Sequence, residues 1–99
     1  MNGYVYLIFD GIYYKIGHTD RNPKLRLQEA QIYNSSELIL VFQYKTIEYK
    51  KLEHFLHRRF HSKHIRGEWF NLTLEDVNSF DATCKLTENN IRVLSESTY

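Results

Sequence analysis

The sequence predicts a small α/β (α+β) domain, in which a three-stranded, mostly antiparallel sheet begins with a hairpin and is flanked by helices. Residues 3–17 form two runs of β-branched and aromatic residues around Asp10-Gly11, a strong signal for a hairpin turn. Residues 38–44 form a third apolar, β-rich run, and apolar residues recur at helical spacing over residues 46–61. A chain of 99 residues that is 42% hydrophobic can fill one compact core.

Composition and charge narrow the class of protein. Cys84 is the one cysteine, which excludes an internal disulfide and fits a reducing compartment. The apolar runs are too short to span a membrane and no signal peptide is evident, so we expect a cytoplasmic, intracellular protein without a membrane partner. Residues 1–67 hold 11 Lys or Arg and 6 Asp or Glu, which indicates an anionic partner for this basic part or a chance asymmetry.

The hairpin turn sets the register of the first two strands. A two-residue loop at Asp10-Gly11 would place Tyr6 directly opposite Lys15. One face would then be apolar and form the core, and the other would present tyrosines and a lysine to a cleft. The core face would carry Val5, Leu7, Phe9, Ile12, Tyr14 and Ile16. The other face would carry Tyr4, Tyr6, Ile8, Tyr13, Lys15 and Gly17.

Two helices should follow the hairpin in the sequence, one before the third strand and one after it. Asn22 is suited to cap a helix that starts at Pro23 and runs to about residue 33. A second helix should start near Thr46, a candidate cap, and reach about residue 61. Glu53 lies at the edge of its apolar stripe, where a carboxylate would look into a cleft or pair with a neighbouring cation.

Residues 54–67 contain no acidic residue and form a candidate surface for a phosphate backbone. The substrate-binding candidates here are His57, Arg58, Arg59, Lys63 and Arg66. Histidines at 54, 57, 61 and 64 would share one face of a longer helix, which leaves a zinc site as a weaker alternative.

The end of the chain should add a short extended segment and a last helix. Residues 68–72 resemble a short strand, and Thr73 is suited to cap a helix through about residue 83. Residues 85–99 are polar and mixed, which predicts a C-terminal extension that is a short helix or frayed. We therefore divide the chain into a domain of residues 1–84 and an extension of residues 85–99.

These residues together resemble the GIY-YIG nuclease superfamily, most closely its phage- and virus-associated branch, in which the second motif reads Lys-Ile-Gly. The resemblance covers about residues 3–72. Its motifs are Tyr4-Val5-Tyr6-Leu7-Ile8, Tyr14-Lys15-Ile16-Gly17, Arg26, Leu52-Glu53 with His57, and Gly67-Glu68-Trp69-Phe70. The string that starts at Gly11 is the hairpin turn rather than the first motif, so Tyr6 takes the place of the first tyrosine and Lys15 that of the second.

The resemblance implies a GIY-YIG-like domain that hydrolyses DNA phosphodiester bonds with a single Mg²⁺ or Mn²⁺ ion. It also implies a cytoplasmic location, with a phage- or virus-infected host cell as one such setting. In the implied site, Tyr6 is the general base and Glu53 holds the metal. Lys15 would lower the pKa of Tyr6, because an ammonium about 4 Å away contributes up to ~4 kcal/mol at an effective dielectric of 20.

Two further residues of the implied site handle protons and phosphate. Arg26 would bind a phosphate oxygen, and His18 would bridge Tyr6, water or phosphate. His57 would orient Glu53. We also expect weak sequence preference, a homodimer or a targeting protein partner. The alternative is a catalytically inactive protein of the same fold that binds nucleic acid or a protein partner.

Overall fold

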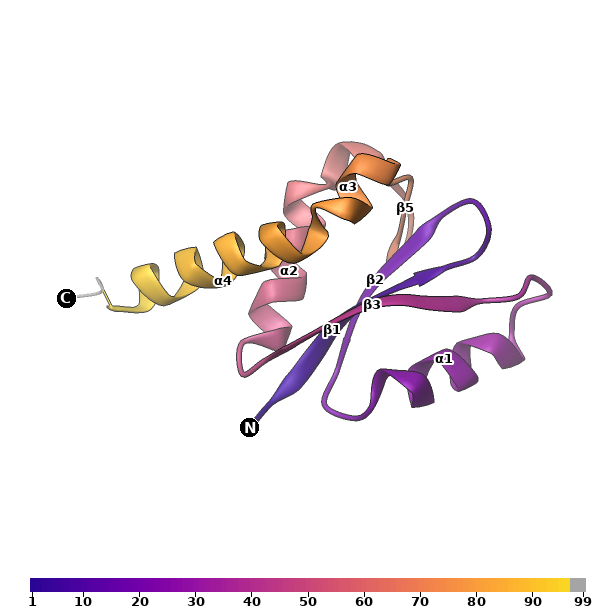
Figure 1. The fold of residues 1–99 in the computed structure, drawn as a ribbon, viewed down its shortest axis with the longest axis horizontal. Helices are drawn as coiled ribbons and strands as arrows, with labels where there is room; N and C mark the ends of the chain where they lie inside the picture. Colours follow the sequence, from indigo (N-terminus) through magenta and orange to yellow (C-terminus); the bar gives the residue numbers. More distant parts are fainter. Residues whose placement is uncertain (97–99) are drawn as a thin grey trace.

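The structure is a computed structural model and describes residues 1–96. It is an α+β domain built on an antiparallel sheet of five strands, two more than predicted, in the order β3-β1-β2-β5-β4 (Figure 1). The strands are β1 Gly3–Phe9, β2 Tyr14–Thr19, β3 Ile39–Thr46, β4 His64–Arg66 and β5 Trp69–Phe70. The helices are α1 Pro23–Ile32, α2 Tyr49–Arg59, α3 Leu74–Asn78 and α4 Phe80–Glu96, with a 3-10 turn at His61–Lys63.

The predicted hairpin register is wrong by two residues. The Asp10 carboxylate accepts hydrogen bonds from the backbone N–H groups of Ile12 and Tyr13, at 2.8 and 2.6 Å, and Gly11 has a φ of 102°. These bonds close a four-residue loop instead of a two-residue turn. Ile12 is therefore 69% exposed in the loop, not in the core as predicted.

The corrected register changes the neighbours of Tyr6 but not its face. Tyr6 lies opposite Gly17, and Lys15 lies opposite Ile8, so the predicted direct pairing of Tyr6 with Lys15 is wrong. A shift of two residues keeps the side chains of β1 and β2 on their predicted faces, because side chains alternate along a strand. Tyr14 accordingly packs against the core, as expected.

Helices cover both faces of the sheet (Figure 1). The face that carries Val5, Leu7 and Ile16 packs against α2 and α4, in the larger of two apolar clusters. The opposite face carries Tyr6 and Ile8 and packs against α1. Tyr6 is thus separated by the thickness of the sheet from the main core.

Helix boundaries match the cap residues only in part. Asn22 caps α1 as predicted, because its side chain accepts a hydrogen bond from Lys24 N at 3.0 Å. Thr46 does not cap α2; its hydroxyl bonds Glu88 and accepts from Glu48 N instead.

The helix α2 ends at Arg59, so the histidines of residues 54–64 do not share one helix face. His61 lies in the 3-10 turn and His64 lies in β4. The described residues contain no group of three or more His, Cys, Asp or Glu side chains placed to hold a metal ion. The alternative of a zinc site built on this histidine run therefore finds no support in the geometry.

The C-terminal part is helical for longer than predicted. Thr73 caps α3 as expected, and the structure adds a capping box with Asp76, but α3 ends at Asn78. The helix α4 then runs through residue 84 without a break and buries Ile91, which is 4% exposed. Residues 97–99 of the predicted extension lie outside the described residues, and the division of the chain after residue 84 stays a prediction. No helix within residues 1–96 is both long and apolar enough to cross a membrane.

The buried position of Ile91 predicts that α4 beyond residue 84 contributes to the stability of the domain. We expect Ile91→Ala to lower the free energy of unfolding by about 2–5 kcal/mol, because it opens a cavity against the core. Leu86→Ala on the same helix is the matched control, because Leu86 is 52% exposed and should cost less than about 1 kcal/mol. Urea unfolding measures both, and equal effects would show that α4 does not pack on the core.

Candidate functional site

The candidate site lies at the end of β2 that β5 leaves open. β5 pairs with β2 at Tyr14 and Lys15, and the last ladder contact on this edge is the bond from Ile16 N to the carbonyl of Glu68, at 2.9 Å. Within the described chain, no strand lies beside Gly17 on this edge. Side chains from α1 and α2 can therefore approach the strand end from both faces of the sheet.

The ring of Tyr6 occupies the space above Gly17. A Cβ atom at position 17 would stand far inside van der Waals contact with the Cζ and Oη atoms of Tyr6. Only glycine leaves this space, and Tyr6 is 1% exposed as a result. The phenol is thus fixed in place, and Arg26 of α1 donates a hydrogen bond to its oxygen.

Burial dominates the electrostatics of Tyr6. Loss of solvent raises the pKa of the phenol above its usual 10.0, and the hydrogen bond and charge of Arg26 offset this only in part. The charges of Glu68 and Glu53 add to the rise. Tyr6 is therefore a neutral phenol at neutral pH.

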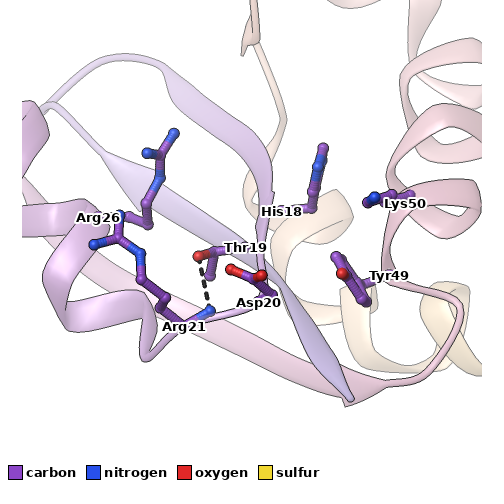
Figure 2. Close-up of a pocket in the computed structure, with 7 residues that line it drawn as sticks. All are labelled: His18, Thr19, Asp20, Arg21, Arg26, Tyr49 and Lys50. Atoms are coloured by element: carbon purple, nitrogen blue, oxygen red, sulfur yellow. Dashed lines mark hydrogen bonds between the residues drawn. The ribbon is translucent and has the colours of Figure 1, made fainter. Parts of the chain in front are cut away.

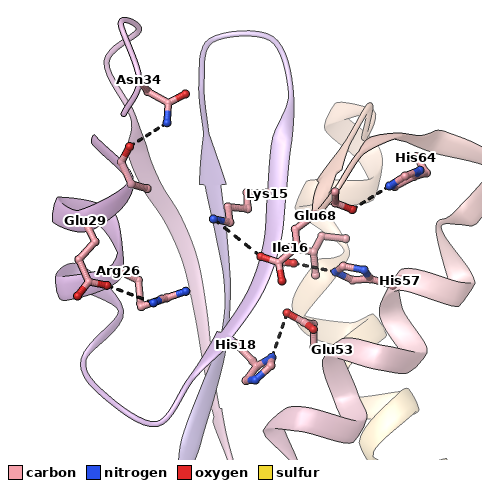
Figure 3. A network of polar contacts seen from close by, with 12 residues as sticks. Lys15, Ile16, His18, Arg26, Glu29, Asn34, Glu53, His57, His64 and Glu68 are labelled. Atoms are coloured by element: carbon pink, nitrogen blue, oxygen red, sulfur yellow. Dashed lines mark hydrogen bonds and ion pairs between the residues drawn. The ribbon is translucent and has the colours of Figure 1, made fainter. Parts of the chain in front are cut away.

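Lys15 does not lower the pKa of Tyr6, contrary to the prediction. Its Nζ atom lies 3.8 Å from Oε1 of Glu68, and the side chain is 21% exposed (Figure 3). It points neither into the core nor to the phenol, and the cation that acts on Tyr6 is Arg26. The expected tuning by a cross-strand ammonium is lost with the register on which it depended.

His18 and Glu53 face each other on the α2 side of the site. His18 Nδ1 lies 3.1 Å from Oε2 of Glu53, whose side chain is 12% exposed (Figure 3). Both facing atoms are buried, and neither makes a well-aligned hydrogen bond. Burial raises the pKa of Glu53 and the charge of Glu68 adds to the rise, while His18 and His57 oppose it.

A polar cleft of about 290 Å³ opens between α1 and α2 beside this pair. Figure 2 shows its lining: His18, Thr19, Asp20, Arg21, Arg26, Tyr49 and Lys50. Arg21 and Arg26 both contact Glu29, at 3.0 and 3.2 Å, and remain 47% and 40% exposed. Three cations against one lining carboxylate suit the cleft to an anionic ligand.

The predicted substrate-binding residues do not form one surface. Arg58 and His57 line a hollow of about 460 Å³ with His54 and His61. Arg59 instead lines a groove between α2 and α4. Lys63 pairs with Asp76, and Arg66 is exposed in β4. His57 does not contact Glu53; its Nε2 atom lies 2.8 Å from the carbonyl oxygen of Ile16, where it holds α2 against β2.

A family model of the T5orf172 domain matches residues 3–84. The chain belongs to the T5orf172 domain family. This domain is phage-associated and falls in a nuclease-related group, which supports a DNA-interacting role in coarse terms. No curated protein and no solved structure matches the chain. The nearer relation to GIY-YIG nucleases stays a prediction.

The T5orf172 domain contains one residue of the site that sequence reasoning did not assign, Glu68. Its carboxylate pairs with Lys15, and its charge raises the pKa of both Tyr6 and Glu53. In the sequence, Glu68 stands out only as part of the Gly67-Glu68-Trp69-Phe70 motif, which assigns it no role. Its place beside β2 follows from the pairing of β5, which residues 68–72 do not specify by themselves.

The environment of Tyr6 predicts an alkaline titration. We expect the ¹³Cζ resonance of Tyr6 to titrate above pH 10, and higher still in Arg26→Gln, which removes the hydrogen bond and the charge that lower its pKa. Arg21→Gln is the matched control, because Arg21 lines the same cleft but does not act on the phenol.

The same shift has a consequence for stability. The pKa of Tyr6 is higher in the folded than in the unfolded state. The contribution of the neutral phenol to the free energy of unfolding is therefore fully present below pH 10, and it is lost as the pH rises through the pKa of the folded state. Titration of Tyr6 below pH 10 would contradict the dominance of burial.

Proposed function

We propose that this T5orf172 domain is a metal-dependent DNA endonuclease, which hydrolyses a phosphodiester bond at the cleft between α1 and α2. The observation that carries the proposal is the meeting of two side-chain pairs at the open end of β2: Arg26 with Tyr6, and His18 with Glu53. They come from β1, β2, α1 and α2, and the charge of Glu53 acts on Tyr6. Phosphodiester hydrolysis needs a hydrogen-bond donor to the phosphate, a carboxylate that can hold a metal ion, and side chains that accept and donate protons.

Glu53 is the residue suited to hold a divalent ion. Its Oε2 atom is buried without a well-aligned hydrogen bond, and Glu68 makes its surroundings more negative. Mg²⁺ and Mn²⁺ take oxygen ligands and commonly use one or two carboxylates, with water and phosphate in the other positions. When bound, such an ion would offset the charge that grows on phosphate and make a bound water more acidic.

Arg26 would bind the scissile phosphate. Its guanidinium lies on the cleft wall, is 40% exposed, and has five N–H donors, of which the contacts to Tyr6 and Glu29 use only some. The remaining donors can bond a non-bridging oxygen, where negative charge increases in the transition state. Arg26 would thus connect the phosphate to the phenol.

Tyr6 would take the proton of the attacking water only in the loaded site. In the free protein its pKa is raised, and Glu53 is one of the charges that raise it. Burial is the larger cause of that rise, so a cation at Glu53 would lower the pKa of Tyr6 only by removing the smaller contribution of this carboxylate and by adding its own positive charge. His18, which lies beside Glu53, would bridge water or phosphate through a hydrogen bond.

A second candidate function is DNA binding without cleavage on the same surface. The observation that favours it is the raised pKa of Tyr6 together with the pairing of Lys15 to Glu68, which leaves one cation on the phenol. Such a protein would hold the phosphate backbone in the cleft through Arg21 and Arg26. A homodimer or a targeting partner is compatible with either function.

Plasmid nicking tests the proposal directly. We expect the full chain to nick supercoiled plasmid in Mg²⁺ or Mn²⁺ and not in EDTA. Glu53→Gln, Arg26→Gln and Tyr6→Phe should each reduce the rate by about 10²–10⁴-fold, the range for loss of a catalytic group or a transition-state donor.

Matched variants control for the changes in chemistry. Glu75→Gln, Arg92→Gln and Tyr33→Phe make the same three replacements away from the cleft and should nick at the rate of the unaltered protein. Equal nicking by all six variants would trace the activity to a contaminant and overturn the assignment. Plasmid binding without nicking would favour the second candidate.

A further inference from the structure

We propose that α2 and the 3-10 turn that follows it carry a phosphate track, formed by Lys50, His54, Arg58 and His61, which holds the DNA backbone beyond the cleft. The track is distinct from the groups that would react with the scissile phosphate. It deepens the proposed function and rests on its DNA-binding part, but not on cleavage.

The helix arranges its exposed side chains in parallel rows. Successive residues turn by about 100°, so positions four apart form a row that winds slowly around the helix. Lys50, His54 and Arg58 form one exposed row, and Lys50 and Arg58 are separated by about 12 Å along the axis at 1.5 Å per residue. Three exposed side chains that are cationic or can donate hydrogen bonds thus lie one turn apart along the same side of the helix.

The track begins at the candidate site and continues away from it. Lys50 lines the cleft beside His18, as Figure 2 shows. About one and two turns further along α2, His54 and Arg58 line a second hollow of about 460 Å³, together with His61 of the 3-10 turn. The neighbouring row holds Glu53 and His57, and the bond from His57 to Ile16 fixes this side of α2 against β2. A strand bound in the cleft therefore has a continuous polar path along the helix.

The cations of the track are available to a ligand. Lys15, Arg21 and Lys63 each pair with a carboxylate of the protein. Within the described residues, neither Lys50 nor Arg58 forms an ion pair, and both are exposed. His54 and His61 can donate hydrogen bonds to phosphate oxygens in either charge state.

The length of the track suits a nucleic-acid backbone. One strand of a duplex carries a phosphate about every 3.4 Å of axis, so about 12 Å of helix spans roughly three phosphates. The side chains of the row are about 6 Å apart along the helix axis, so they would meet about every second phosphate of a strand that runs parallel to α2.

The adjacent row of α2 provides a built-in comparison. Lys51 and Arg59 are also exposed, and each directly follows a track residue in the sequence. Their row is turned by about 100° towards α4, where they line grooves with Phe55 and Ile91. We therefore place Arg58 in the track and leave Arg59 out of it, although the sequence predicted both as substrate-binding residues. Both arginines lie in the last turn of α2, where each interacts favourably with the helix dipole.

Two charge-matched double variants test the track. Binding of the full chain to a fluorescein-labelled 20-base-pair duplex is measured by anisotropy in EDTA between 50 and 200 mM NaCl, so that cleavage cannot interfere. We expect Lys50→Gln/Arg58→Gln to weaken binding about tenfold or more at the lower salt concentration. The slope of log K against log[salt] should become shallower by about 1.8, since each lost phosphate contact contributes about 0.9.

The control removes the same net charge from the same helix. Lys51→Gln/Arg59→Gln should bind within about twofold of the unaltered protein and keep its salt slope, and Lys50→Arg/Arg58→Lys should retain binding. Equal weakening by the two glutamine double variants, or no binding by the unaltered protein, would overturn the track. Nicking with equal weakening would refute the track alone, whereas track-dependent binding without nicking would refute cleavage alone.

Discussion

The packing of the Tyr6 ring over Gly17 is the constraint on which the candidate site depends. Because position 17 has no side chain, the phenol lies at the open end of β2 instead of being pushed away from the sheet. Arg26 reaches it from α1, and Glu53 approaches from α2 on the other side of the strand. A side chain at position 17 would displace the ring and separate these groups, so one glycine links the fold of the hairpin to the chemistry of the cleft.

Burial and charge oppose each other throughout this site. Desolvation raises the pKa of both Tyr6 and Glu53. The charge of Glu68 raises both pKa values further, and the charge of Glu53 adds to the rise for Tyr6. The balance keeps the phenol neutral in the free protein, because burial outweighs the effect of Arg26 and Lys15 pairs with Glu68 instead. Ligands that bring positive charge to Glu53 would shift the balance, which makes the state of the site dependent on what it binds. The same electrostatics separates a cutting protein from one that only binds.

Much of the fold follows from local sequence patterns, and the errors arise where distant residues decide. The faces of the hairpin, the cap at Asn22 and the cap at Thr73 could be predicted because each depends on neighbours in the chain. The length of the hairpin loop could not be predicted, since hydrogen bonds to the Asp10 carboxylate close a four-residue loop instead of a two-residue turn. Strands β4 and β5 have three and two residues, too few to show a period. The partner of Lys15 depends on their pairing and was missed for the same reason.

We propose that Glu53 binds a divalent ion in the space beside His18 and Tyr6. Paramagnetic broadening of ¹⁵N-labelled protein by Mn²⁺ tests it most directly, because broadening falls steeply with distance and needs no activity. We predict that amide signals around His18 and Glu53 broaden first, and that Glu53→Gln abolishes this effect. Broadening centred elsewhere, or unchanged in Glu53→Gln, would contradict the account.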